Sequence, residues 1–527
     1  MSINKKQIKF EGWFIFKKPF VIIGLICLLG LVFRIYFFTP DIPVTHDSNG
    51  YFWYAIETSI TGSFPTVECE WKCTFPNTGW PSFLSIFFTI FSFDNYLDYM
   101  NLQRYLGIII SVVTVIPLFY FCKVFVGKKY AIIGSMLFAF NPRIIENSIL
   151  GTTEPMYILG ITLMLYTFFQ HGKNYAFITF GIIGIISIIR YEGLLLFVPF
   201  SLLYFYKFKF SKKSIQKYCI AVAIFLLITI SWGMMKIDLT GQDGMISHVV
   251  AGPNYYNDVI KESHDPNEAI TSFLNTGFNN MLRFSVLATL PILTFLIPFG
   301  IYIMISKKDL SNFLILFCIT LTLLLPVFYA YSRSFQDVRY LLPIFPIFCL
   351  FSVYFIRNIT EKIKYKKTFL ILFTVIVISS SIGFIEFKNA DDVNKVEVYE
   401  FSKVIYSTVS IANYFSHEEY LDSIRMESIE EFPILRKDLP KGIPIIYIDH
   451  SINYNNLEEF IEKNRSNGLT HIIVDKGDSR TGFFDDVYQN EEKYLYLTKI
   501  FDTFENGYKD YHAKIFEINF NKFDELK

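Results

Sequence analysis

The chain has 527 residues, of which 52% are hydrophobic, and it carries 48 Lys and Arg against 48 Asp and Glu. A mean hydropathy of +0.36 excludes an ordinary soluble domain. The net charge of zero gives no support for a nucleic-acid partner. The composition therefore predicts a polytopic α-helical membrane protein.

The first long apolar segment covers residues 20–38 and is interrupted only by Arg34. Its length of roughly 20 residues is enough to span a hydrocarbon core about 30 Å thick. A basic stretch precedes it, and no small-residue cleavage site of a signal peptide follows it. We therefore expect this segment to remain attached as the first span, with a cytoplasmic N-terminus.

The stretch Thr45-His46-Asp47-Ser48-Asn49-Gly50-Tyr51 follows directly and places a carboxylate just outside the bilayer. A charge at the bilayer centre would cost roughly 2.5 to 3.5 kcal/mol, whereas one at the edge stays ionised and can face a lipid-borne substrate. Asp47 is therefore a candidate for chemistry at the membrane surface, and a helix-capping or loop aspartate is the alternative. In the same polar loop, Cys69 and Cys73 are candidates for a disulfide.

Ten further apolar runs follow, at roughly 105–126, 130–141, 155–170, 175–189, 193–206, 218–235, 284–305, 311–330, 338–356 and 368–385. With the first span they make about eleven transmembrane helices. Every second loop is basic, at 127–129, 171–173, 207–217, 306–308 and 357–367, so the positive-inside rule places these loops in the cytoplasm. The short apolar stretch 81–93 is predicted to lie in the membrane interface.

The tail changes character near Phe387, where charge density rises and long apolar runs end. Ile443–Ile448, Leu457–Asn464 and Thr470–Val474 alternate as strand, helix and strand. We therefore predict a transmembrane domain at 1–387, with a catalytic first external loop at 39–100. A small extracytoplasmic α/β domain is predicted at 388–527. The expected location is the cell membrane, with several spans.

A second carboxylate is expected on the same face as Asp47. Gly151-Thr152-Thr153-Glu154-Pro155 opens a predicted span, which places Glu154 at a helix N-terminus. The helix dipole favours a negative charge there by roughly 0.3 to 1 kcal/mol, so capping alone would explain it. Two carboxylates at one face could also act as a base with a positioning partner, or as a metal clamp.

Arginines gather at the external ends of the spans, at Arg104, Arg143, Arg190, Arg283, Arg333 and Arg339. The guanidinium group presents a planar fork of donors suited to phosphate oxygens, so such a group beside a bilayer could bind a lipid phosphate. The alternative for each is an interfacial anchor or an ion pair. Arg339 is the preferred candidate because it lies at a span entrance, and Asp337 could be its salt-bridge partner.

The first external loop with its Asp, Glu154-Pro155, Arg190-Tyr191-Glu192-Gly193-Leu194-Leu195-Leu196 and Arg339-Tyr340-Leu341-Leu342-Pro343-Ile344-Phe345-Pro346 together resemble the GT-C superfamily of integral-membrane glycosyltransferases. The branch most similar is that of protein O-mannosyltransferases and lipid A aminoarabinose transferases, over roughly residues 20–386. Where the mannosyltransferases tend to carry Asp-Glu, this chain has His46-Asp47.

The resemblance implies inverting transfer of a hexose-type sugar from a polyprenyl-phosphate donor to a hydroxyl of an extracytoplasmic protein, lipid or glycan. Asp47 would be the general base and Glu154 a second catalytic residue. The substrate-binding residues would be His46, Tyr51, Arg143, Arg190, Glu192, Arg339 and Tyr340. The Trp-Trp-Asp signature and the paired acidic metal motif of oligosaccharyltransferases are missing. No cofactor is therefore expected, and a divalent metal is possible but not required.

Three other functions are alternatives to hydroxyl glycosylation. An oligosaccharyltransferase-like enzyme is the alternative within the same class. A transporter or lipid flippase would place polar residues in the middle of several spans and show internal repeats. The spans are instead nearly free of ionisable groups. A scaffolding membrane protein would tolerate replacement of Asp47 and Glu154.

Overall fold

The computed structural model describes residues 19–65, 77–170, 172, 174–262, 266–306, 310–391, 394–413, 420–421, 445–446, 454–476 and 482–526. The chain divides into two compact units. The helical unit comprises Met1–Phe38, Tyr51–Phe91 and Leu102–Ile385, and the α/β unit comprises Thr39–Gly50, Ser92–Asn101 and Glu386–Lys527. The predicted disulfide between Cys69 and Cys73 lies outside the described residues.

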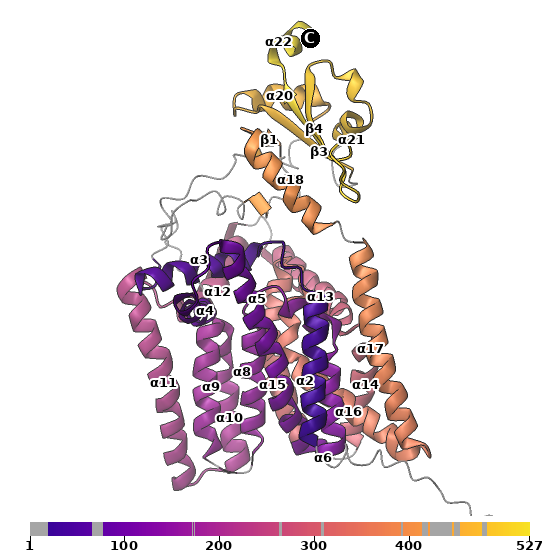
Figure 1. The fold of residues 1–527 in the computed structure, drawn as a ribbon. Helices are drawn as coiled ribbons and strands as arrows, with labels where there is room; N and C mark the ends of the chain where they lie inside the picture. The colour runs from indigo at the N-terminus through magenta and orange to yellow at the C-terminus, as the bar shows by residue number, and fades with distance from the viewer. Residues whose placement is uncertain are drawn as a thin grey trace, which may run out of the picture. The chain divides into compact units, whose positions relative to one another are not determined.

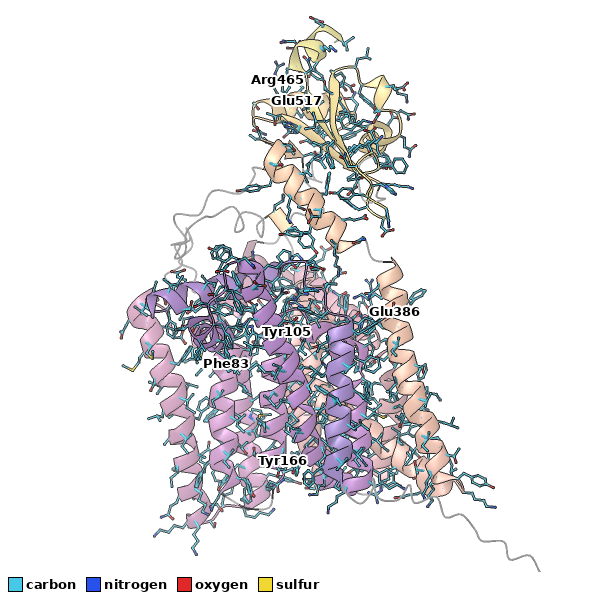
Figure 2. All side chains as sticks on the ribbon, viewed as in Figure 1. Phe83, Tyr105, Tyr166, Glu386, Arg465 and Glu517 are labelled. Carbon is cyan, nitrogen blue, oxygen red and sulfur yellow. The ribbon has the colours of Figure 1, made fainter. Side chains whose placement is uncertain are left out.

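Long apolar helices form most of the helical unit (Figure 1). In chain order the elements up to its end are α2 (Pro19–Tyr36), α3 (His46–Thr61), α4 (Gly79–Ile90), α5 (Tyr96–Val113), α6 (Val115–Ala139), α7 (Pro142–Ser148), α8 (Glu154–Phe168), α9 (Tyr175–Ile189), η1 (Tyr191–Leu196), α10 (Phe197–Phe208), α11 (Lys212–Thr240), α12 (Ile246–Glu262), α13 (Pro266–Thr289), α14 (Leu293–Ser306), α15 (Leu310–Ser332), η2 (Val338–Ile344), α16 (Phe345–Lys362) and α17 (Lys366–Asp391). Figure 2 places Phe83 and Tyr105 towards one end of this unit and Tyr166 towards the other.

The chain is a multi-pass membrane protein. Within the described residues, six helices are long and apolar enough to cross a membrane, or seven if the bent pair α13 and α14 forms one span. The predicted number of about eleven is larger because it counts the stretch Tyr96–Ala139 as two spans and because it includes α8, α9 and α10, which have 15, 15 and 12 residues. At 1.5 Å per residue, these helices are shorter than a hydrocarbon core of about 30 Å.

Two predicted segments differ in detail from the structure. The predicted span 284–305 is bent in the structure, because α13 and α14 meet there at an angle of 102°. Pro291 lies between them and supplies no backbone N–H to continue the helix. In α6, Gly127 has a φ of 77° between two helical stretches, so the chain turns at the predicted basic loop.

Buried polar contacts join the first span to its neighbours. The Arg34 side chain is completely buried in α2. Its guanidinium donates to the carbonyl oxygens of Gly30 at 2.9 Å and Ala139 at 3.0 Å, and to the Ser111 hydroxyl at 3.0 Å. A buried charge is tolerated only when such bonds replace its water, so Arg34 connects α2 with α5 and α6.

Gly300 allows the close approach of α14 and α16, since a Cβ at this position would overlap the carbonyl oxygen of Phe351. We expect Gly300→Ala to destabilise the protein by about 1 to 3 kcal/mol, because the two helices must separate. The matched control is Gly383→Ala in α17, where an added Cβ meets nothing within 4 Å. Thermal unfolding of the purified protein in detergent measures both. A midpoint for Gly300→Ala equal to that of the control would contradict this packing.

The α/β unit contains a five-stranded sheet with the order β2-β1-β3-β5-β4. Its elements are α18 (Lys395–Thr408), β1 (Ala412–Asn413), β2 (Ile445–Ile446), α20 (Leu457–Arg465), β3 (His471–Asp475), α21 (Gly482–Gln489), η4 (Glu491–Lys493), β4 (Leu497–Asp502), β5 (Ala513–Ile518) and α22 (Phe520–Leu526). Strand β1 is parallel to β2 and β3, whereas β5 is antiparallel to β3 and β4. The predicted strand, helix and strand correspond to β2, α20 and β3.

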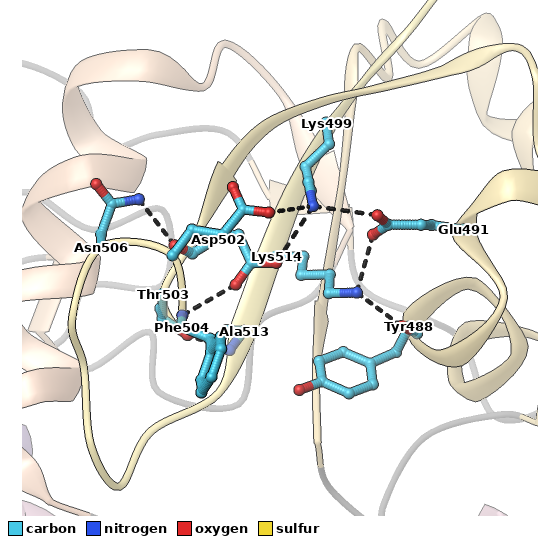
Figure 3. Close-up of polar contacts among 10 residues, drawn as sticks. Tyr488, Glu491, Lys499, Asp502, Thr503, Phe504, Asn506, Ala513 and Lys514 are labelled. Carbon is cyan, nitrogen blue, oxygen red and sulfur yellow. Dashed lines mark hydrogen bonds and ion pairs between the residues drawn. The ribbon is translucent and has the colours of Figure 1, made fainter.

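Two lysines connect the antiparallel strands with η4 (Figure 3). Lys499 of β4 forms ion pairs with Glu491 at 3.1 Å and Asp502 at 3.4 Å. Lys514 of β5 reaches Glu491 at 2.8 Å and the carbonyl oxygen of Tyr488 at 2.9 Å. The partners are partly exposed, so the network orders the strand ends but contributes little to stability.

Glu397 makes the stability of the α/β unit depend on pH. Its carboxylate accepts three backbone N–H bonds, from Lys509 and Asp510 at 2.9 Å and from Tyr511 at 2.7 Å. Burial raises the pKa of Glu397, but these bonds outweigh burial and hold the pKa below its ordinary value. The stabilisation is therefore complete above the ordinary glutamate pKa of about 4.3 and is lost as the pH falls through the lower, folded-state pKa.

We expect the protection of the 509–511 amides against hydrogen exchange to fall about tenfold as the pH drops through this window, after correction for intrinsic exchange rates. Glu397→Gln removes the charge at every pH, so its protection is already reduced at pH 7 and changes less on acidification. Glu400→Gln, at an exposed position in the same helix, is the matched control. Equal pH profiles for wild type and Glu397→Gln would contradict the role of the carboxylate.

Candidate functional site

The helical unit contains a cavity of about 650 Å³. Its lining combines apolar side chains, many of them from α15, with arginine, glutamate, histidine and tyrosine side chains. The lining residues are Tyr157, Arg190, Tyr191, Glu192, Leu195, Leu196, His248, Val249, Ala251, Gly252, Pro253, Thr322, Leu323, Leu325, Pro326, Val327, Tyr329, Ala330, Arg333, Phe335, Tyr340 and Pro343. The size and the mixture of surfaces are typical of a ligand site.

Helix interruptions bring the polar side chains to this cavity. Helix α9 ends at Arg190, whose backbone is extended with φ −142° and ψ 122°, and the chain continues as the short η1. Gly193 permits this reversal because a Cβ there would lie 2.8 Å from the backbone nitrogen of Ser187. A second 3-10 segment, η2, contains Pro343 and carries Tyr340. The two 3-10 segments therefore present Glu192 and Tyr340 to the cavity.

Arg190 holds two carboxylates at the centre of the site. One guanidinium nitrogen contacts Glu154 Oε1 at 2.6 Å, and the other contacts Glu192 Oε1 at 2.9 Å. The exposed fractions of Arg190 and Glu154 are only 9% and 4%. These two contacts use both terminal nitrogens of the planar guanidinium group and so fix its plane. The guanidinium carbon also lies 5.7 Å from the centre of the Tyr157 ring. Glu154 is therefore engaged in a buried ion pair as well as beginning α8.

Three more predicted residues adjoin this ion-pair cluster. Tyr51 of α3 is buried and interacts electrostatically with Arg190. Arg339 interacts electrostatically with Glu154, and its Nε forms an ion pair with Asp337, the partner proposed from the sequence. The structure thus brings Tyr51, Glu154, Arg190, Glu192, Arg339 and Tyr340 together in one region of the helical unit.

Arg143 lies elsewhere. It forms an ion pair with Glu146 at 3.0 Å and donates to the Leu287 carbonyl oxygen at 3.2 Å, and it is not among the residues that line the cavity. The ion pair with Glu146 is the alternative that the sequence left open for this arginine, and its substrate-binding role stays a prediction.

His46 and Asp47 form the beginning of α3, and both side chains are exposed. They belong to the α/β unit by contacts, whereas Tyr51, one turn later on the same helix, belongs to the helical unit. His46 has a φ of 51°, a left-handed conformation that starts the helix abruptly. Asp47 is thus an exposed carboxylate in the first turn of α3.

The cavity also contains residues that the sequence did not identify. His248 of α12 faces the Tyr191 ring at 5.5 Å, and Tyr329 of α15 donates to the Gly252 carbonyl oxygen at 2.7 Å. The sequence named Arg333 as one of six arginines at external span ends but did not single it out. Its guanidinium carbon lies 5.7 Å from the Tyr329 ring and 5.3 Å from the Phe335 ring. Single residues such as His248 carry no sequence pattern, so only packing could reveal them.

Over the described ranges, no group of three or more His, Cys, Asp and Glu is arranged to hold a metal ion. The cavity offers guanidinium, phenol and imidazole groups together with the Glu192 carboxylate, which Arg190 engages.

No protein-family model and no curated protein matches the sequence. The fold is similar to that of the Archaeoglobus fulgidus oligosaccharyltransferase in the apo form, with a TM-score of 0.57 and 12% identity over 88% of this chain and 70% of that one. The same enzyme with an inhibitory peptide and a dolichol-phosphate gives a TM-score of 0.52 at 12% identity, with the same coverage.

ArnT from Cupriavidus metallidurans bound to undecaprenyl phosphate matches at a TM-score of 0.47 and 10% identity, over 94% of this chain and 97% of that one. The structural similarity to the oligosaccharyltransferase concerns the fold, and this is the fold expected from the resemblance of the sequence motifs. The chain has the fold of the GT-C superfamily of integral-membrane glycosyltransferases.

Proposed function

We propose that this protein transfers a sugar from a polyprenyl-phosphate donor to a hydroxyl group of an extracytoplasmic acceptor. The observation that carries the proposal is the cavity of about 650 Å³, which combines apolar side chains, many of them from α15, with Arg190, Arg333 and several tyrosines. A prenyl chain needs the first kind of surface, and a phosphate needs the second. The complex of the Archaeoglobus fulgidus enzyme with dolichol-phosphate supports this donor class.

The proposed reaction is a single displacement that inverts the anomeric carbon. The acceptor hydroxyl oxygen forms a bond to that carbon as the bond to the phosphate oxygen breaks, and polyprenyl phosphate leaves. Asp47 accepts the hydroxyl proton as the general base. The leaving group is already anionic, so it needs little acid catalysis, and Arg333 at the cavity stabilises its charge. Arg190, held by Glu154 and Glu192, orients the donor.

The alternative from the sequence, an oligosaccharyltransferase-like transfer to an asparagine amide, is not favoured, because the Trp-Trp-Asp signature and the paired acidic metal motif are missing. The acceptor distinguishes the two reactions, because an amide product and a hydroxyl product separate after mild base treatment. The proposed hydroxyl transfer does not require a bound metal, and activity retained in the presence of EDTA would support that part.

The proposal is tested with membranes that contain the protein and radiolabelled polyprenyl-phosphate sugars. We expect the wild type to transfer label. Arg333→Gln should lower the rate by about 10- to 100-fold, because it removes a charge-assisted contact to the phosphate. Arg283→Gln is the matched control, since Arg283 is also exposed but does not line the cavity. Absence of transfer from every donor by folded wild type would contradict the function, and equal rates for both variants would contradict the phosphate site.

A further inference from the structure

A second cavity, of about 410 Å³, lies at the opposite ends of helices that also form the candidate functional site. Helix α10 follows η1 at the first cavity and reaches the second with Lys207 near its last residue. Helix α15 contributes Ser311 and Asn312 to the second cavity and Thr322 to Ala330 to the first. The two cavities are therefore separate, and the proposed sugar transfer does not use the second.

Lys207 places a cation inside this cavity. Its Nζ donates to the carbonyl oxygens of Phe168 and, at 2.9 Å, of Gln170, and thus caps the end of α8. The ammonium also lies 5.1 Å from the Phe168 ring and 5.9 Å from the Phe169 ring. An ammonium has three N–H donors, so one remains for a ligand after these two carbonyl bonds.

Lys209 adds a second cation at the mouth. It ends α10 with a φ of 59°, a left-handed conformation, and its side chain is exposed. The Tyr206 and Ser311 hydroxyls form a hydrogen bond of 3.3 Å in the same cavity, and the hydroxyl that accepts in this pair keeps its proton to donate to an anion. Among the described residues that line the cavity there are two lysines and no carboxylate. The polar side of the cavity is therefore suited to an anion of low charge.

The remaining wall is apolar and includes Phe125, Phe169 and Ile315. Tyr166, one turn before Phe169, marks this end of the helical unit in Figure 2. The same end carries the basic turn at 127–129. An anion attached to hydrocarbon would occupy both surfaces at once, whereas a free anion would leave the aromatic wall in contact with water.

We propose that this cavity binds the phosphodiester headgroup of an anionic bilayer glycerophospholipid, with Lys207 and Lys209 at the phosphate and the aromatic wall against the glycerol and upper acyl chain. The leaflet that faces basic loops is the one rich in anionic lipids, and such lipids occupy basic pockets between transmembrane helices. The site would anchor α8, α10 and α15 to one lipid at the end remote from the first cavity.

The test is native mass spectrometry of the delipidated full-length protein with equimolar phosphatidylglycerol and phosphatidylcholine. We expect the wild type to retain phosphatidylglycerol preferentially, and each lysine replacement to reduce this preference by about fivefold. Lys207→Gln keeps a donor for the α8 carbonyls. Lys209→Gly suits the left-handed backbone, so it tests the site even if Lys207→Gln fails to fold. Lys128→Gln, which removes an exposed lysine at the same end, is the matched control.

Each remaining outcome bears on the proposal. Loss of preference in Lys209→Gly but not in Lys128→Gln would support it. Equal retention of the two lipids by the wild type, or wild-type preference in both cavity variants, would overturn it. Displacement of phosphatidylglycerol by an equal concentration of inorganic phosphate would also overturn the lipid assignment, because the ligand would then be free phosphate.

Discussion

We expect Asp47→Asn to lower the rate of sugar transfer by at least about 100-fold, which is the contribution typical of a general base. The amide keeps the size of the carboxylate but cannot accept the acceptor proton. Because the Asp47 side chain is exposed, its replacement should leave the fold intact. The measurement is transfer of radiolabelled sugar from the polyprenyl-phosphate donor at matched expression, together with the thermal unfolding midpoint of the purified protein.

Asp41→Asn is the matched control for Asp47→Asn. Asp41 is also exposed and lies in the same connection after the first span, but it precedes α3. We expect its transfer rate to stay within about twofold of the wild type, as for a surface substitution away from the chemistry. Equal transfer by wild type and Asp47→Asn would remove Asp47 from the mechanism, while leaving the donor site open to the Arg333 test.

The second large effect is expected from Arg190→Met, which should destabilise the protein by about 3 to 5 kcal/mol. The replacement leaves the carboxylates of Glu154 and Glu192 without their shared cation in a buried region. Glu154→Gln in the Arg190→Met background should recover part of the loss, because it removes one of the two uncompensated charges. Thermal and chemical unfolding of the purified protein in detergent measure these changes.

The control for the ion-pair cluster is Arg357→Met. Arg357 forms an ion pair with Glu361 at 2.8 Å, with side chains 34% and 42% exposed. Solvent screens this pair, so its loss should cost at most about 0.5 kcal/mol. If Arg190→Met and Arg357→Met were equally stable, or if Glu154→Gln lowered stability further in the Arg190→Met background, the buried cluster would not have the assigned role.

The order of the apolar segments was accessible from the sequence because hydropathy is a local property of the chain. It located α2, α11, α15, α16 and α17, together with the turn at Gly127 and the strand, helix and strand of the tail. It did not separate full spans from short apolar helices such as α8 and α9. Their length is set by breaks such as the one at Arg190, which depend on packing around Gly193 and not on hydropathy.

The candidate site was only partly predictable. Glu154, Arg190, Glu192 and Tyr340 were recognised from motifs at span ends, and packing places them around one cavity or its adjoining ion pair. The sequence could not distinguish arginines that bind protein carboxylates from those that line the cavity, because both kinds sit at span ends. Arg143 holds a glutamate away from the cavity, Arg190 holds two glutamates and also lines the cavity, and Arg333 lines it beside two aromatic rings.

By itself, the sequence determined that this is a multi-pass membrane protein with charged residues at its span ends, because the cost of burying charge in hydrocarbon acts on each segment separately. The tertiary structure decided which of those charges meet. Glu154, Arg190 and Tyr340 lie in different helices, and their convergence depends on how α8, α9 and η2 pack. The same packing decided that His248 and Arg333 share the cavity with them. Contacts between residues distant in the chain arise from the fitting of side chains across helix surfaces, and no local pattern records that fit.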